Sequence, residues 1–258
     1  MNIVVCVKLT PDPGDIEVLS DRSISLERAE WVIGSFDLQA IEAGVQLVEA
    51  DGGKVTVLSA GPPRANNSKL KKDILSRGPD ELVMVIDDLL KDAGTAQTAR
   101  VLARAIGEIG AVDLVLCGEG SADLYFQQVG IQVGERLGWP ALNAISKIDR
   151  LDGSLLVERN LEDEVEVLEV ALPAVLAVTT DIHQARLPTM KEILKSSKKP
   201  VLEWTLADLQ SEASAGAAPE VVSVRAPEQV ERKQIRVEGP ANEAARALVA
   251  HLAKEGVL

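Results

Sequence analysis

At 258 residues, the chain is long enough for one large α/β core, or for one such core with an appendage. Its formal net charge of −13 argues against a nucleic-acid partner, because phosphate contacts need clustered Lys and Arg. Aromatic residues make up only 2% of the chain, so the core must be built mainly from Val, Leu, Ile and Ala.

The N-terminal sequence MNIVVCVKL enters an apolar strand directly, with neither a basic leader nor a small-residue cleavage site, so we expect no signal peptide. The longest apolar stretch, near VALPAVLAV, is interrupted by Pro and falls short of the about 20 apolar residues of a membrane span. Cys6 and Cys117 each end a strand-like run and are expected to be reduced thiols. These features predict a cytoplasmic protein without stable membrane insertion. With two His in the chain and no Cys/His spacing to match, no metal site is expected.

The first half of the chain alternates between strand and helix patterns. Strand-like runs cover residues 3–7, 54–59, 82–86, 114–117 and 141–145, and helical periodicity covers residues 37–49, 68–76 and 95–109. This alternation predicts a doubly wound α/β fold, with a mostly parallel sheet of the Rossmann-like, adenine-nucleotide-binding class. Ligands of such sheets bind beyond the carboxyl ends of the strands, near the point where strand order reverses.

After about Lys147 the pattern changes. The sequence LLVERNLEDEVEVLEVALPAVLAVTT predicts strands at residues 155–161, 165–172 and 174–179, and hence an antiparallel hairpin added to the sheet. The acidic turn at residues 162–164 is most simply a solvated hairpin tip. The segment LPTMKEILKSSKKP follows as a short helix closed by Pro200. It carries the lysines Lys191, Lys195, Lys198 and Lys199, which are most simply cations that complement a helix end.

The sequence SEASAGAAPE, residues 211–220, has the composition of a linker. Beyond it, residues 221–239 could be extended, and PANEAARALVAHLAKEG predicts an amphipathic helix whose apolar side includes Leu248 and Val249. We therefore divide the chain into a nucleotide-binding domain, 1–210, and a C-terminal arm, 211–258. The helix either folds back on its own domain or packs on another subunit, since alone it cannot bury its apolar side.

The segment DLVLCGEGSADLYFQQVGIQVGERLGWP, residues 113–140, predicts a strand, a loop with Gly118 and Gly120, and a helix with Val129 and Val133 on one face. Glycines let a ligand approach the main chain closely, and the free N–H groups of a helix start favour an anion. This arrangement indicates a nucleotide phosphate. An ordinary strand-to-helix turn is the alternative, because neither G-x-x-x-x-G-K-[ST] nor a clean G-x-G-x-x-G is present.

Together these pieces resemble the β subunit of electron transfer flavoproteins over nearly the whole chain. The sequence VERNLEDEVEVLEVALPAVLA, residues 157–177, fits the family signature with Arg159, the acidic cluster, Glu166 and Pro173. The segments VVCVKLTPD, SFDLQAIEAGVQL, LSAGPP and ILSRGPDE support it. CGEGSADLYFQQVG and LSRGPDELVMVIDD are most similar to the bacterial branch associated with carnitine metabolism and nitrogen fixation.

The resemblance implies an electron carrier without catalytic residues of its own. Such a β subunit pairs with an α subunit, which makes most of the contacts to FAD, and electrons pass from acyl-CoA-type dehydrogenases toward a quinone-linked or other acceptor. The resemblance also implies a bound AMP, and Arg159 near the flavin. Carried over position by position, the AMP site comprises Cys6, Gly34, Ser35, Phe36, Asp37, Ala60, Gly118, Glu119, Gly120, Ser121, Asp123, Gln127, Gln128 and Val129.

The loop departs from the pattern D-G-D-T-A-Q-V-G-P of electron-bifurcating relatives, in which a second FAD is bound. Asp123 and Gln128 are retained, whereas Tyr125 and Phe126 add bulk. We therefore expect AMP, with a second FAD as the alternative. A different class of function also stays open: a stand-alone adenine-nucleotide-binding regulatory module in which this loop holds ATP.

The resemblance further places a partner-docking loop at Leu187, Pro188 and Met190, with the Leu187 side chain entering the dehydrogenase. From the residues alone, Leu187 could equally be a hydrophobic staple that packs on the helix after it.

Overall fold

The computed structural model describes residues 1–210, 221–228 and 232–258. These residues form two compact units, one of Met1–Glu17 with Ser25–Ser223, the other of Val18–Ile24 with Val224–Leu258. The predicted linker at 211–220 lies outside the described residues, and the domain boundary at residue 211 therefore stays a prediction.

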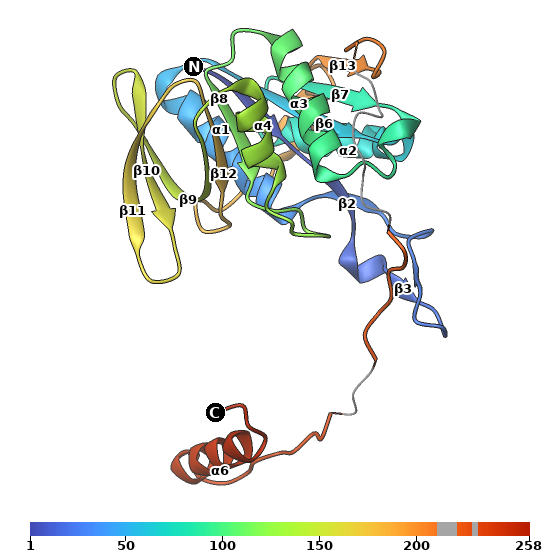
Figure 1. Cartoon of the computed structure of the whole chain (residues 1–258), viewed down its shortest axis with the longest axis vertical. Coiled ribbons are helices and arrows are strands. Elements are labelled where there is room, and N and C mark those ends of the chain that lie inside the picture. Colours follow the sequence, from blue (N-terminus) through green and yellow to red (C-terminus); the bar gives the residue numbers. More distant parts are fainter. Residues whose placement is uncertain (211–220, 229–231) are drawn as a thin grey trace. The chain divides into compact units, whose positions relative to one another are not determined.

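The first unit is built on a nine-stranded sheet with the order β11-β10-β9-β12-β8-β1-β6-β7-β13 (Figure 1). All neighbours run parallel except β10, which is antiparallel to both β9 and β11. From β1 the chain proceeds to β6 and β7 on one side and returns with β8 on the other, so strand order reverses between β1 and β8. The predicted doubly wound, mostly parallel α/β fold is confirmed.

The strands of this sheet are β1 Asn2–Cys6, β6 Lys54–Gly61, β7 Glu81–Ile86, β8 Leu114–Gly118, β9 Ala141–Arg150, β10 Ser154–Asn160, β11 Val165–Ala171, β12 Ala174–Val178 and β13 Val201–Trp204. Short strands outside it are β2 Leu9–Pro11, β3 Glu17–Val18, β4 Ile24–Ser25 and β5 Trp31–Ile33. The helices are α1 Ser35–Asp51, α2 Ser68–Ser76, α3 Thr95–Ile109, α4 Val129–Leu137, α5 Met190–Ser196 and α6 Ala241–Lys254.

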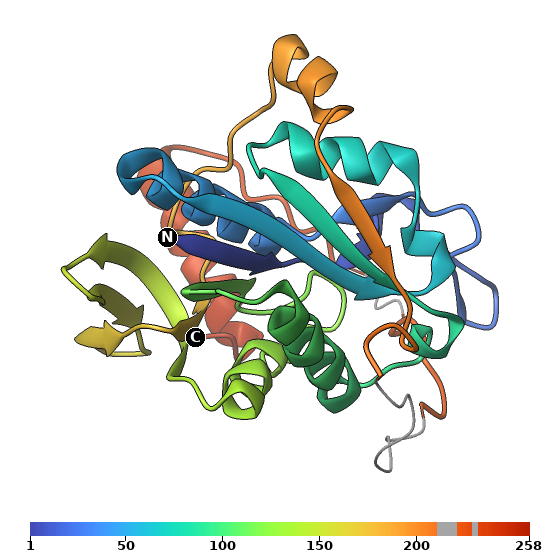
Figure 2. The ribbon, with the colours of Figure 1, turned by 90° about the horizontal axis from the view of Figure 1, so that it is seen from above.

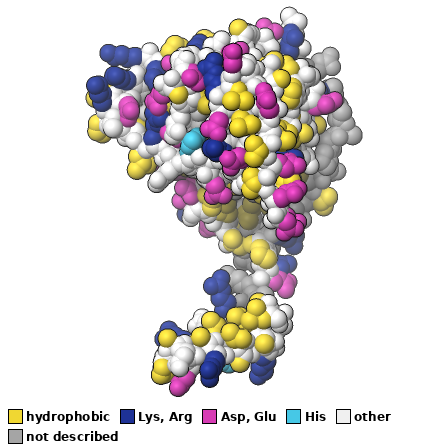
Figure 3. Space-filling model, turned by 90° about the vertical axis from the view of Figure 1, so that its left-hand side faces the viewer, with side chains coloured by type: hydrophobic (Ala, Val, Ile, Leu, Met, Phe, Trp, Pro, Cys, Tyr) yellow, Lys and Arg dark blue, Asp and Glu magenta, His cyan; other side chains and the backbone are white. Residues whose placement is uncertain are grey.

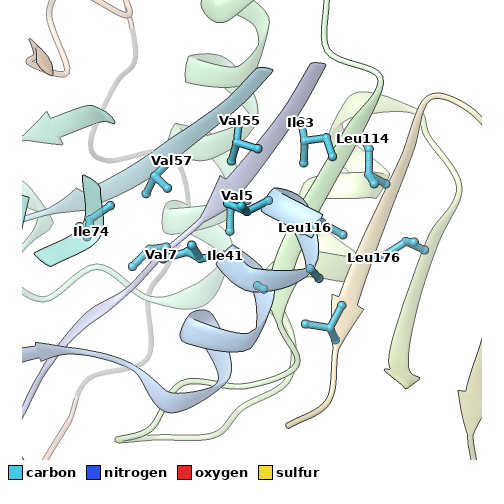
Figure 4. Packing of buried hydrophobic residues seen from close by; sticks show 14 of the residues in the cluster. Ile3, Val5, Val7, Ile41, Val55, Val57, Ile74, Leu114, Leu116 and Leu176 are labelled. Carbon is cyan, nitrogen blue, oxygen red and sulfur yellow. The ribbon is translucent and has the colours of Figure 1, made fainter. Parts of the chain in front are cut away.

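Helices cover both faces of the sheet, with α1 and α2 on one side and α3 and α4 on the other (Figure 2). Ile3, Val5 and Val7 point toward α1, and Val4 and Cys6 point toward the opposite face. On the first face, aliphatic side chains of α1 and the central strands interlock (Figure 4). Because β1 is buried on both faces, its sequence is a continuous apolar run rather than an alternating one.

The C-terminal half of β9 was not predicted. This strand pairs in parallel with β12, passes a register irregularity near Ala144, whose φ is 58°, and continues to Arg150 beside β10. The predicted hairpin is present as β10 and β11, joined by the acidic turn. The distal part of β9, SKIDR, is polar, and its pairing with the hairpin therefore left no hydrophobic pattern to recognise.

The second unit contains the predicted amphipathic helix as α6. Within this unit Ser23 bridges Arg225, and the Ala226 N–H donates to the Arg22 carbonyl at 2.8 Å. No residue of α6 is buried, and Leu248 and Val249 are 50% and 55% exposed. Among the described helices, none combines the length and the apolar character that crossing a bilayer requires.

Candidate functional site

The candidate site begins where β1 and β8 end, at the reversal of strand order. Cys6 and Cys117 are neighbours in the register of these strands, and both are buried and free of disulfide bonds, as predicted. A hydrogen bond with Cys117 and burial raise the pKa of the Cys6 thiol well above its ordinary value. Both cysteines therefore act as small core residues beneath the site.

Asp37 joins three elements at this point. Its buried carboxylate, in the first turn of α1, accepts the Lys8 N–H at 2.7 Å and the Gly118 N–H at 3.3 Å. Burial raises the pKa of Asp37 to about 7, although the two N–H donors act in the opposite direction. The carboxyl group thus ties the end of β1, the end of β8 and the start of α1 together.

A pH dependence follows from the raised pKa of Asp37. Between the ordinary value of 3.8 and about 7, the unfolded chain loses this proton while the folded chain keeps it. The free energy of unfolding of the wild type should therefore fall, relative to Asp37→Asn, as pH rises through this window, by up to roughly 4 kcal/mol, and level off above it. Urea unfolding across the pH range measures this difference. Asp88→Asn removes an exposed carboxylate and controls for the lost charge. If the difference in free energy of unfolding between wild type and Asp37→Asn does not change with pH, the pKa of Asp37 is not raised.

Close packing around Gly118 explains why the loop begins with a glycine. A Cβ atom at Gly118 would lie 2.6 Å from Asp37 Oδ1 and 2.6 Å from Phe36 Cβ. Any side chain there would push α1 away from β8 and break the Asp37 hydrogen bond. Glycine at position 118 therefore allows β8 and α1 to approach each other closely.

The following loop is folded around Tyr125. The Tyr125 ring covers Gly120, lies with its centroid 5.2 Å from the Phe36 ring, and its hydroxyl donates to the Glu119 carboxylate. The backbone of Tyr125 and Gln127 has φ of 48° and 56°, the left-handed region that L residues adopt uncommonly. The start of α1 and the loop before α4 contain the only tyrosine of the chain, Tyr125, and both phenylalanines, Phe36 and Phe126.

Lys8 was not predicted as a site residue. Its Nζ lies 2.7 Å from both carboxylate oxygens of Asp123. Burial raises the pKa of Asp123, but the hydrogen bonds from Lys8 and Ser121 outweigh it, so the pKa lies below its ordinary value. Lys8 is a cation placed directly after the first strand, where a parallel sheet presents residues to a ligand.

Three helices start at this edge without a side-chain cap. The N-caps of α1, α3 and α4 are Gly34, Gly94 and Gln128, whereas α2 and α5 are capped by the side chains of Asn67 and Thr189. Uncapped first turns leave N–H groups available to an anion. Thr95, a second residue that was not predicted, donates to the Gln128 amide oxygen at 2.9 Å and connects the starts of α3 and α4.

The predicted cofactor-binding residues thus lie in two separate places. Those from β1, α1, the 118–129 loop and the neighbouring end of β6, where Ala60 lies, come together at one edge of the sheet. Arg159 lies apart, on β10, with β9 and β12 between its strand and β8. Arg159 donates to Asn143 at 2.7 Å and pairs across the hairpin with Glu166 at 3.3 Å. The ion pair that such a hairpin favours is therefore present.

The predicted docking residues lie on a third surface, at the start of α5, which stands out from the sheet (Figure 2). Leu187 is 87% exposed and Met190 is 72% exposed, while Pro188 is half-buried. A side chain this exposed does not pack on the following helix, so the interpretation of Leu187 as a hydrophobic staple is wrong.

Of the four lysines predicted to complement the end of their own helix, Lys199 bonds instead to the end of α2. Lys199 Nζ donates to the Leu75, Gly78 and Pro79 carbonyls at 2.9, 3.1 and 2.6 Å, at the end of α2. In the upper part of the molecule in Figure 3, Lys and Arg side chains gather at the upper left, and acidic and hydrophobic side chains are mixed toward the right.

Among the residues that the structure describes, no group of three or more His, Cys, Asp or Glu side chains is placed to hold a metal ion. Comparison with known protein families identifies an electron-transfer family. The model of the electron transfer flavoprotein domain matches residues 23–209, which is most of the chain and includes the hairpin.

Proposed function

Since the chain belongs to the electron transfer flavoprotein domain family, we propose that it is the β subunit of a heterodimeric electron transfer flavoprotein. In this role it passes electrons from an acyl-CoA-type dehydrogenase toward a quinone-linked or other acceptor. The observation that supports membership of this family is the match over residues 23–209, which includes the 118–129 loop and the hairpin of β10 and β11. The β-subunit role rests on the resemblance of residues 157–177 to the β-type signature.

We further propose that the edge between β1 and β8 holds AMP. The uncapped starts of α1, α3 and α4 offer main-chain N–H groups to a phosphate, and Lys8 adds a cation. Asp123 and the Gln127 and Gln128 amides can bond ribose hydroxyls. The residues present therefore fit an adenine nucleotide.

Tyr125 favours AMP over a second FAD. Its ring covers Gly120 and contacts Phe36, so the space over the glycine loop is occupied by side-chain atoms. A dinucleotide needs a longer open path along the loop than a monophosphate does.

FAD, held mainly by the α subunit, supplies the capacity to accept and release electrons. This chain is proposed to bind AMP and to place Arg159 near the flavin. Arg159, anchored by Asn143 and Glu166, is proposed to lie toward the flavin, where its guanidinium would contribute a positive charge.

The test is to co-express and co-purify the chain with an electron transfer flavoprotein α subunit, denature the complex, and identify the released nucleotides by chromatography with mass detection. We expect one FAD and one AMP per heterodimer. Two FAD without AMP would contradict the AMP assignment, and a monomer that binds ATP and no flavoprotein partner would favour a regulatory module instead.

A matched pair of variants localises the AMP. Lys8→Gln should lower the AMP content and leave FAD unchanged, because it removes the cation at the carboxyl edge. Lys54→Gln is the control: its lysine is similarly exposed, and its Nζ pairs with Glu81 at 2.6 Å, but it lies at the amino end of β6. Equal loss of AMP in both variants would argue against this edge.

A further inference from the structure

Arg186, the residue before Leu187, is bound by two carboxylates of α1. Its Nε and Nη2 donate to Glu42 at 2.8 and 3.0 Å, and its Nη1 and Nη2 donate to Glu49 at 2.7 and 2.9 Å. Both contacts are bidentate, the geometry that makes an Arg–carboxylate pair strong and directional. The main-chain N–H of Arg186 donates to Glu42 as well, at 3.1 Å, so the backbone itself is held.

Burial makes this clamp more than a surface ion pair. The Glu42 side chain is 5% exposed and the Arg186 side chain 27%, while Glu49 closes the outer side at 59%. Burial raises the pKa of Glu42, but hydrogen bonds from Arg186 and Gln46 outweigh it and leave the pKa below its ordinary value. Hydrogen bonds to Glu49 and Glu42 raise the pKa of Arg186. A carboxylate as buried as Glu42 needs this partner to stay charged.

The chain is fixed on both sides of Leu187. Before it, the Arg186 carbonyl accepts a hydrogen bond from Arg77 Nη1 at 3.0 Å, which adds a link to the end of α2. After it, Thr189 and Glu192 form a reciprocal capping box that starts α5. Leu187 is nevertheless 87% exposed. An apolar side chain is thus held out from a main chain that is itself firmly anchored.

We propose that Arg186 is a positioning residue for partner docking: its clamp on Glu42 and Glu49 orders the loop in advance, so that Leu187 meets the dehydrogenase without an ordering cost. The inference rests on the proposed electron-carrier role and on the docking role that the family resemblance implies for Leu187. A loop that must be ordered during binding loses affinity, and a preordered one retains it. The nucleotide edge is not involved, because Glu42 and Glu49 lie further along α1 than Asp37.

The test compares Arg186→Met with Arg150→Met in the co-purified complex. Arg150 is the matched control because it pairs with another carboxylate of α1, Asp51, at 3.2 Å. In Arg186→Met we expect faster amide hydrogen exchange at residues 184–189 before any dehydrogenase is added. We also expect the KM for the dehydrogenase to rise about tenfold while kcat and flavin content stay unchanged. Arg150→Met should alter neither.

Two results would overturn the inference: unchanged exchange in Arg186→Met, or faster exchange with an unchanged KM. If Arg186→Met does not fold, Glu49→Gln decides instead, because Glu49 is the exposed half of the clamp, and it should produce a smaller change in the same direction. A separate result would show that Leu187 does not dock the dehydrogenase. Leu187→Ala would then leave the KM for the dehydrogenase unaltered, while Arg186→Met would still speed amide hydrogen exchange in the loop.

Discussion

Removal of the residues after Ser211 is expected to abolish assembly with the α subunit and to leave the first unit folded. The described part of the removed segment contains α6, whose Leu248 and Val249 are half exposed and which has no buried residue. A 14-residue helix is marginal in water unless a partner covers its apolar side. Size-exclusion chromatography of the co-expressed subunits measures assembly, and thermal unfolding followed by circular dichroism checks the sheet domain.

A single substitution sharpens this experiment. Leu248→Asp places a charge on the apolar side of α6, where the partner would have to bury it, and should weaken assembly at least tenfold. Ala250→Asp adds the same charge to the opposite side of the helix and should have little effect. Normal assembly of the truncated chain would mean that α6 folds back on its own domain, the alternative left open by the sequence.

The alternation of strand and helix patterns was sufficient to predict the central architecture. Helices at residues 68–76 and 95–109 coincide with α2 and α3, because both combine an amphipathic pattern with clear ends. The edge strand β13, Val201–Trp204, was not predicted. Among the described strands it pairs with β7 alone. It alternates little and is four residues long, so its formation depends on a tertiary contact that leaves no pattern in the sequence.

For the candidate site, the sequence indicated which residues lie at the carboxyl ends of the strands, but not which of them bond to one another. Gly118 was identified from the loop pattern, and Asp37 and Asp123 from the resemblance, and the three lie at one edge of the sheet. Lys8 was missed because a single lysine after a strand has no distinctive pattern, and its partner Asp123 is 115 residues away in the chain. Such a pair exists only once β1 and β8 lie side by side.

The loop around Leu187 shows the same limit of sequence-based prediction. Glu42 and Glu49 are seven residues apart, a spacing that places both carboxylates on one face of a helix. The sequence alone does not show what they bind, because Arg186 is 144 and 137 residues away from them. Only the folded chain shows that these carboxylates hold the residue next to Leu187.

Leu187→Ala is expected to lower kcat/KM for electron transfer from the dehydrogenase by about tenfold to a hundredfold. Burying a leucine side chain in a partner contributes about 1.5–3 kcal/mol, and each 1.4 kcal/mol corresponds to a factor of ten. In the free protein the side chain is 87% exposed, so its truncation removes almost no packing and should leave the melting temperature unchanged. Stopped-flow reduction of the flavin by the dehydrogenase measures the rate.

Leu89→Ala is the control for this experiment, since Leu89 is also exposed, at 63%, and lies in the short 3₁₀ helix Asp88–Leu90. It should leave both rate and stability unaltered. A loss of stability in Leu187→Ala with normal electron transfer would mean that Leu187 packs on this chain in solution. An equal loss of rate in both variants would point to a nonspecific apolar attraction, because a docking residue must act through its own position beside Arg186.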